Sequence, residues 1–307
     1  MATVAAKPEL APNERRSFWI RLRDGERVLK QDPDWIEFVG AEWPERIMAE
    51  EVTDRSHAKQ GRSIGRWTLT AGDEKLVVYL KRHYVLPRSH GFFAALFPSS
   101  AWSPGLDEWN HLASAKAMNL PVPRAVAGGE FRGPWGKLQS FLAVEELAGM
   151  LPLHEAIPLA SQSLSPVEFS RWKRGLIDEL ARLSCELHRR RYFHQDLYLC
   201  HFYILESDAQ CVPESWFERA VMIDFHRLAR HRLAWQWWQL KDLAQLLFST
   251  FGVEGITDRD RARFWKCYRR QGWNDSTPPP RWLRPAAMAK ARRYDRHNAN
   301  RAARNAA

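Results

Sequence analysis

Two aspartates, each preceded by a short run rich in apolar residues, are the side chains in this sequence best suited to chemistry. Asp196 follows Tyr192-Phe193-His194-Gln195, and Asp224 follows Val221-Met222-Ile223. Phosphoryl transfer uses such a pair, because one Asp orients the attacking hydroxyl while the other holds magnesium against the phosphates. The two runs therefore predict one polar cleft that contains both carboxylates.

The residues around each carboxylate match part of a protein kinase motif. His194-Gln195-Asp196 resembles His-Arg-Asp, and Asp224-Phe225-His226 resembles Asp-Phe-Gly. Protein kinases carry Asn five residues after the first Asp, whereas this chain carries His201. This replacement separates the chain from ordinary protein kinases.

The stretches 194–202 and 223–227 together resemble the lipopolysaccharide kinase family, the heptose and Kdo kinases of the bacterial outer-membrane core. In that family a His stands where protein kinases carry Asn, and Asp-Leu-His-Arg or a close variant replaces Asp-Phe-Gly. His201, His226 and Arg227 agree with that pattern. The resemblance is specific at these two stretches and is supported by weaker signals over roughly residues 60–250.

The resemblance implies a fold, a reaction and a substrate. The fold is α+β, bilobal and protein kinase-like, with a small β-rich N-lobe and a mainly helical C-lobe. The reaction is transfer of the γ-phosphate of ATP, with Mg²⁺, to a hydroxyl of heptose or Kdo in the lipopolysaccharide inner core. The expected partners are the lipopolysaccharide core or another lipid-linked sugar acceptor, and an anionic membrane surface.

Each candidate residue has a role in this chemistry. Asp196 is the predicted catalytic group and Asp224 the predicted magnesium ligand. His201 could ligate the metal or hold Asp224 by a hydrogen bond, and because magnesium prefers oxygen we expect the second role or a water-mediated contact. We expect His194 to support the loop backbone. Asp242 falls where kinases keep a buried Asp that braces this loop, and an Asp at a helix N-terminus is the alternative.

An upstream β-rich segment predicts a phosphate-binding hairpin. Residues 60–84 contain two strand-like runs joined by the turn Ala71-Gly72-Asp73. In a kinase-like N-lobe, Gly61 and Gly65 would lie over the phosphates, and Lys81 would contact them. Glycines that serve only backbone turns and an exposed lysine at a strand end are the alternatives.

Further elements follow from periodicity and capping signals. Residues 106–118 predict a helix on which Glu108 is the candidate ion-pair partner of Lys81, with a solvated Glu as the alternative. Strands are predicted at 124–126 and 138–145, around Gly-rich turns that include Gly128-Gly129. A capping box at Ser165-Pro166-Val167-Glu168 predicts the start of a long helix.

These elements predict four parts, which are a leader and N-terminal extension (1–36), a kinase-like N-lobe (37–147), a kinase-like C-lobe (148–276) and a basic tail (277–307). The segment 281–307 carries eight Lys or Arg against one acid. We expect a solvated tail, with a basic helix on anionic lipid as the alternative.

The net charge of +10 favours anionic partners, which include nucleotides, phospholipids and phosphorylated glycolipids. Nucleic acid is an unlikely partner, because no nucleic-acid-binding signature is present. Four Cys without zinc-ligand spacing and no apolar leader favour a cytoplasmic location, peripheral on the inner face of the inner membrane. Basic residues beside Phe92–Phe97 suit a membrane contact, and a buried helical turn is the alternative.

Three other functions remain open. One is a kinase-like phosphotransferase with a protein or small-metabolite acceptor. Another is a non-catalytic pseudokinase, because His201 replaces Asn and no full glycine-rich loop is visible. The third is a transition-metal hydrolase that uses His194, Asp196 and His201, but it leaves Asp224 and Lys81 without a role. The sequence predicts no oligomeric state.

Overall fold

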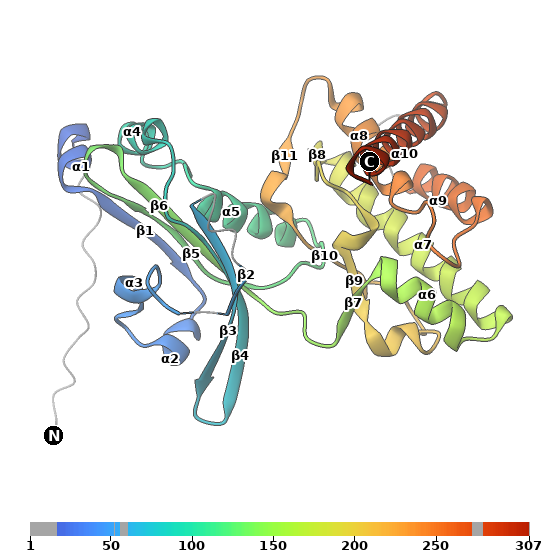
Figure 1. Ribbon diagram of the computed structural model, residues 1–307, viewed down its shortest axis with the longest axis horizontal. Helices are drawn as coiled ribbons and strands as arrows, with labels where there is room; N and C mark the ends of the chain where they lie inside the picture. The colour runs from blue at the N-terminus through green and yellow to red at the C-terminus, as the bar shows by residue number, and fades with distance from the viewer. Residues whose placement is uncertain (1–16, 52, 56–60, 272–278, 307) are drawn as a thin grey trace. The chain divides into compact units, whose positions relative to one another are not determined.

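The structure is a computed structural model that describes residues 17–51, 53–55, 61–271 and 279–306. The chain forms two compact units (Figure 1). The first unit comprises Met1–Asp107 and Val126–Ala143, and the second comprises Glu108–Ala125 and Val144–Ala307.

These units differ from the predicted parts at several boundaries. The chain enters the second unit after Ala143 rather than after residue 147, and Glu108–Ala125 belongs to the second unit rather than the first. Residues 1–16 of the predicted leader and the predicted boundary at 276/277 lie outside the described residues.

The first unit is built on a six-stranded sheet with the order β1-β5-β6-β4-β3-β2. The strands are β1 (Glu26–Gln31), β2 (Thr53–Arg55), β3 (Arg62–Ala71), β4 (Glu74–His83), β5 (Ala125–Arg132) and β6 (Leu138–Glu145). β3 and β4 form the predicted hairpin, with Ala71 opposite Glu74 across the turn. β1 comes from the predicted N-terminal extension and pairs antiparallel with β5.

The prediction of a turn at Gly128-Gly129 is wrong. Both glycines lie inside β5, where they pair with Lys30 and Leu29 of β1. A Cβ atom on Gly129 would lie 2.5 Å from the carbonyl oxygen of Val28, so the glycine permits the two backbones to approach closely.

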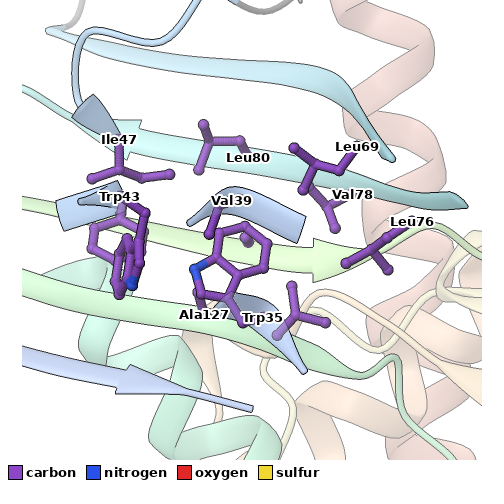
Figure 2. Packing of buried hydrophobic residues seen from close by; sticks show 12 residues of the cluster. Trp35, Val39, Trp43, Ile47, Leu69, Leu76, Val78, Leu80 and Ala127 are labelled. Atoms are coloured by element: carbon purple, nitrogen blue, oxygen red, sulfur yellow. The ribbon is translucent and has the colours of Figure 1, made fainter. Parts of the chain in front are cut away.

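Among the described residues of this unit, the helices are α1 (Phe18–Asp24), α2 (Trp35–Val39), α3 (Trp43–Arg46), α4 (Arg88–Leu96) and the first residues of α5 (Pro104–Ala117). The unit also contains the 3₁₀ turn η2 (Pro134–Gly136). Trp35 and Trp43 of α2 and α3 pack edge to face, 6.0 Å between ring centroids. Figure 2 shows them beside Val78 and Leu80 of β4, in one buried cluster. Two of the fifteen tryptophans of the sequence therefore lie in this core.

The second unit is mainly helical, as predicted. Its elements are β7 (Met150–Pro152), α6 (Leu153–Ser163), α7 (Pro166–Arg189), β8 (Tyr192–Phe193), η3 (Leu199–His201), β9 (Phe202–Leu205), η4 (Glu206–Ala209), β10 (Val221–Met222), η5 (Phe225–Arg227), β11 (Ala229–Arg230), α8 (Trp235–Phe248), α9 (Asp258–Arg270) and α10 (Leu283–Ala306). The strands form two small sheets, β10-β9-β7 and β11-β8.

The long helix α7 begins at the predicted capping box. The Ser165 side chain accepts a hydrogen bond from the Glu168 backbone N–H, and the Glu168 carboxylate accepts one from the Ser165 backbone N–H. This reciprocal cap satisfies N–H groups that the first turn would leave unpaired. The helix buries its apolar face and delivers the chain to β8.

The expectation of a solvated C-terminal tail is wrong. α10 packs on α8 (Figure 1), and Leu283, Ala287 and Ala291 at four-residue spacing are fully buried. Small residues on one face allow the close approach, while the arginines occupy the rest of the surface. Within the described residues no helix is both long enough and apolar enough to cross a bilayer.

Candidate active site

The backbone of the loop that carries Asp196 is hydrogen-bonded to the side chain of Asp242. Asp242 is fully buried in the middle of α8, and its two carboxylate oxygens accept hydrogen bonds from the backbone N–H groups of His194 and Gln195, both at 2.8 Å. This confirms the predicted bracing role. The alternative of an Asp at a helix N-terminus is wrong, because α8 begins seven residues earlier, at Trp235.

A buried network supports Asp242 in turn. Nε2 of His188, on α7, lies 3.3 Å from the Asp242 carboxylate, and Nδ1 of the same ring lies 2.6 Å from the hydroxyl of Tyr268. Gln239 donates to that hydroxyl at 2.8 Å. Burial raises the pKa of Tyr268 well above its ordinary value, so the hydroxyl stays protonated. Helices α7, α8 and α9 therefore fix the loop together.

Arg227 and Gln245 position the Asp196 carboxylate, a role that the sequence motifs do not specify. Nη1 of Arg227 lies 3.1 Å from one Asp196 oxygen, and Nε2 of Gln245 lies 3.4 Å from the other. Gln245 also donates to the hydroxyl of Tyr198 at 3.0 Å. Gln245 interrupts an apolar stretch of α8 three residues after Asp242, and this spacing is a signal from which its role could have been predicted.

Asp224 lies two residues after the end of β10, directly before η5, and adopts the left-handed backbone region with φ 66° and ψ 53°. A non-glycine residue in this conformation is strained, and such strain is common at functional sites. One carboxylate oxygen of Asp224 accepts a 2.5 Å hydrogen bond from Nδ1 of His226, and the other lies 3.7 Å from Nε2 of His201. An imidazole thus approaches each oxygen of the carboxylate.

His226 also approaches the first carboxylate, because its Nε2 lies 3.9 Å from an oxygen of Asp196. The hydrogen bond to Asp224 raises the pKa of His226 above its ordinary value and outweighs the effect of partial burial. One imidazole therefore approaches both the predicted catalytic Asp196 and the predicted magnesium ligand Asp224. This arrangement confirms that the second unit brings Asp196 and Asp224 into one site.

His201 is fixed by the loop itself. Its Nδ1 donates to the backbone carbonyl of Asp196 at 2.7 Å, and Nε2 is left to face Asp224. Burial of the ring acts to lower the pKa of His201, but Cys200, the Asp196 carbonyl and the Asp224 charge together raise it. The predicted direct hydrogen bond from His201 to Asp224 is not formed, because the two atoms lie 3.7 Å apart. The water-mediated contact stays a prediction.

His194 supports the backbone, as predicted. Its Nε2 donates to the carbonyl of Ile223 at 2.9 Å, which links the Asp196 loop to the residue before Asp224. Burial lowers the pKa of His194, so the ring is neutral. Its Nδ1 is buried and has no hydrogen-bond partner among the described residues, and the ring packs 5.1 Å from Phe225.

A sequence model of the lipopolysaccharide kinase (Kdo/WaaP) family matches residues 59–268 of this chain. The chain belongs to this family. The resemblance that the two motifs predicted is therefore confirmed.

Two relatives in this family are named lipopolysaccharide core heptose(I) kinase WaaP. The protein from Pseudomonas aeruginosa is 32% identical over 164 residues, which cover 53% of this chain and 59% of that protein. The protein from Escherichia coli is 29% identical over 187 residues, which cover 60% of this chain and 67% of that protein. The matched region thus spans less than two thirds of the Pseudomonas relative.

A solved structure of WaaP in complex with acyl carrier protein is similar to this chain, with a TM-score of 0.62 and 25% sequence identity. The match covers 87% of this chain and 98% of that chain. The predicted α+β, bilobal, protein kinase-like fold is confirmed by this similarity.

Three of the predicted nucleotide-binding residues of this Kdo/WaaP family member lie in the first unit. Lys81 is near the end of β4, as expected for a phosphate-binding lysine. Gly61 directly precedes β3 with φ 64°, whereas Gly65 lies within β3. The segment between β2 and β3, at residues 56–60, lies outside the described residues.

Glu108 is a buried residue of α5, and it is the first residue of that helix that belongs to the second unit. Its charge contributes to the raised pKa of His226, so it lies within electrostatic reach of the Asp224 end of the site. The predicted pairing of Glu108 with Lys81, and the phosphate contacts of Lys81, Gly61 and Gly65, stay predictions.

The donor set fits magnesium bound through a nucleotide rather than a closed metal cage. Magnesium is commonly held by one or two carboxylates together with substrate phosphates and water, and Asp224 offers a partly exposed carboxylate of this kind. Within the described residues, no cluster of three or more His, Cys, Asp or Glu could hold a metal ion. His194 and His201 each use a ring nitrogen on a backbone carbonyl, so the geometry does not favour the transition-metal hydrolase.

Proposed function

We propose that this chain is an ATP-dependent kinase that phosphorylates a hydroxyl of a heptose or Kdo sugar in the lipopolysaccharide inner core. The observation that carries the proposal is the pair of carboxylates, Asp196 and Asp224, brought together around the His226 imidazole. Family membership supports the acceptor class, because the curated relatives are named core heptose(I) kinases.

Asp196 would accept the hydrogen bond of the sugar hydroxyl and orient its oxygen towards the phosphoryl group. Its carboxylate is kept in place by Arg227 and Gln245, and the backbone before it is kept in place by Asp242. A hydroxyl held in this way reacts as part of one complex, so correct placement lowers the barrier.

Asp224 would hold Mg²⁺, and Lys81 would hold the α- and β-phosphates of ATP. Bound Mg²⁺-ATP supplies the phosphoryl group and the metal charge that stabilises it during transfer. His226 donates a hydrogen bond to one oxygen of Asp224 and would fix the orientation of its carboxylate.

The test is transfer of the γ-phosphate from Mg²⁺-ATP to purified, dephosphorylated lipopolysaccharide core. Asp196→Asn should reduce transfer by about a hundredfold or more, because it removes the hydroxyl-orienting carboxylate. Asp258→Asn is the matched control, since that side chain is 93% exposed on α9 and has no role in the site. The control should transfer phosphate at the rate of the unaltered protein.

The other outcomes identify the alternatives. Transfer that persists in Asp196→Asn would overturn the assigned role of the carboxylate. Transfer to proteins or small metabolites but not to the core would identify another kinase-like phosphotransferase. ATP binding without transfer to any acceptor would identify a pseudokinase.

The WaaP structure in complex with acyl carrier protein suggests a further partner. We propose that this chain also binds an acyl carrier protein, because the solved structure that it resembles contains one. Acyl carrier protein should raise the thermal unfolding midpoint of the chain, whereas an unrelated protein of similar size and charge should not.

Two expectations on location also remain proposals. We propose a cytoplasmic site of action at the inner face of the inner membrane, because ATP is the phosphate donor and the acceptor is anchored in lipid. All four cysteines are free thiols, in keeping with a reducing compartment. Fractionation of cells that express the chain, with and without a high-salt wash, would test this location.

A further inference from the structure

An exposed aromatic surface lies on the first unit, on residues that have no role in phosphoryl transfer. We call it the aromatic platform, and it is formed by α1, α4 and η2, which pack against one another. Its exposed large apolar side chains are Trp19, Phe92, Phe93, Leu96, Phe97 and Trp135. Monomeric soluble proteins rarely expose so many large apolar side chains together, and such patches mark interaction sites.

Helix α4 has the reverse of the usual surface pattern. The residues that it buries are small, namely Gly91, Ala94 and Ala95, whereas Phe93 and Leu96 are 46% and 48% exposed. A helix on the surface of a globular protein normally turns its large apolar residues inwards. The alternative of a buried helical turn in this stretch is therefore wrong.

The platform is held rigid by close contacts between its parts. A Cβ atom on Gly91 would lie 2.2 Å from the carbonyl oxygen of Gly136, so α4 and η2 touch through their backbones. A Cβ on Gly136 would lie 2.9 Å from the ring of Phe92. Arg21 of α1 donates to the carbonyl of Ala95 at 2.7 Å. The exposed rings are therefore presented by a fixed backbone.

Trp135 combines a strained backbone conformation with a largely exposed side chain. Its φ of 55° and ψ of 41° lie in the left-handed region, which is strained for any residue with a Cβ. Its indole is 58% exposed, so the strain is not offset by full burial of the ring. Such a combination is expected where a residue serves a contact outside the folded chain.

The charged residues around the platform are mainly basic, which favours contact with an anionic surface. Arg88 and Lys137 are exposed beside the aromatic rings, and Asp24, the only acid in α1, α4 and η2, is paired with Arg23. A second copy docked through the same face would bring these cations towards one another. Aromatic rings at the headgroup level with cations on lipid phosphates form a favourable membrane contact.

We propose that the aromatic platform docks the chain on a bilayer that contains anionic phospholipid. Trp19, Trp135 and the outer face of α4 would enter the headgroup region, and Arg88 and Lys137 would contact lipid phosphates. The inference stands on the surface of the first unit and does not depend on the acceptor proposed above.

Sedimentation with vesicles tests the proposal without ATP or acceptor, so its failure is distinguishable from failure of the proposed function. The unaltered protein should bind phosphatidylglycerol vesicles and not phosphatidylcholine vesicles. Trp19→Ser/Trp135→Gly should weaken this binding by about tenfold or more, because it removes two interfacial rings. The glycine also relieves strain, so thermal unfolding should occur at an unchanged or higher temperature.

The matched control removes two exposed tryptophans elsewhere, in Trp237→Ser/Trp282→Ser, and should bind vesicles as the unaltered protein does. Arg88→Gln should weaken binding by about fivefold, from about 1 kcal/mol for each cation near an anionic surface. Absence of binding by the unaltered protein would overturn the proposal. A change of oligomeric state in the platform variant, with vesicle binding unchanged, would instead identify a contact between copies of the chain.

Discussion

Replacement of Asp242 by Asn should loosen the Asp196 loop while leaving the protein folded. Each carboxylate oxygen of Asp242 accepts one backbone N–H at 2.8 Å, from His194 and from Gln195. An amide has only one acceptor oxygen, so its NH₂ group must face one of these N–H donors. The variant therefore loses one charge-assisted hydrogen bond. The NH₂ group of the asparagine then faces a buried backbone N–H, so that two hydrogen-bond donors lie against each other without an acceptor.

The magnitude follows from these two losses. A hydrogen bond to a charged group contributes about 1.5–3 kcal/mol, and an unsatisfied buried donor costs about 1–3 kcal/mol. Added together they predict a loss of about 2.5–6 kcal/mol, which lies below most of the range of domain stability, about 5–15 kcal/mol. The loop should then shift, and a displacement of about 1 Å at Asp196 would lower kcat by about a hundredfold.

Urea unfolding followed by circular dichroism measures the stability, and phosphate transfer measures kcat and KM separately. The exposed Asp258→Asn change is again the matched control and should alter the free energy of unfolding by less than about 1 kcal/mol. An Asp242→Asn protein with the urea midpoint of the unaltered chain would refute the bracing role. A raised KM for ATP with kcat unchanged would show that Asp242 acts on nucleotide binding instead.

Two further predictions concern titratable groups outside the site. Burial acts to raise the pKa of Asp260, but hydrogen bonds from Lys173 and Thr257 outweigh it and hold the pKa below its ordinary value. The stabilisation that Asp260 contributes is therefore fully present above the ordinary pKa of an aspartate and is lost as the pH falls through the lower, folded pKa. Asp260→Asn should cost about 1–2 kcal/mol at neutral pH, and urea midpoints measured towards acid should converge with those of the unaltered chain. Burial raises the pKa of Cys185 to about 12, so a maleimide should modify exposed Cys211 first and Cys185 only in urea, as mass spectrometry would show.

Local signals in the sequence predicted the elements that position the site. The capping box and three-to-four spacing predicted α7, and the Gly72 turn between β-branched runs predicted the β3–β4 hairpin. The motif stretches also predicted that Asp196 and Asp224 share one site. These features depend on neighbours within a few residues, which is why they can be predicted without a structure.

Contacts between distant segments were harder to predict. The pairing of β1 with β5 joins segments about a hundred residues apart, and nothing in residues 26–31 specifies a partner. Gln245 and Arg227 reach Asp196 only after α8 and η5 have packed, so the motif that contains Arg227 and the spacing of Gln245 do not by themselves specify these contacts. The burial of α10 through alanines was not predicted, because the excess of basic over acidic residues in that segment favoured a solvated tail.

The presence of His201 where protein kinases carry Asn does not disrupt the Asp196 loop. In the family pattern it stands where protein kinases carry Asn, and it was one of two reasons to consider a non-catalytic protein. His201 donates through Nδ1 to the Asp196 carbonyl, as an amide could, and so holds the loop. A ring nitrogen is a poor magnesium ligand, and Nε2 indeed lies 3.7 Å from Asp224, beyond direct hydrogen-bond distance. The replacement therefore keeps the loop contact and leaves the predicted magnesium contact to Asp224, which weakens the argument that the site has lost its activity.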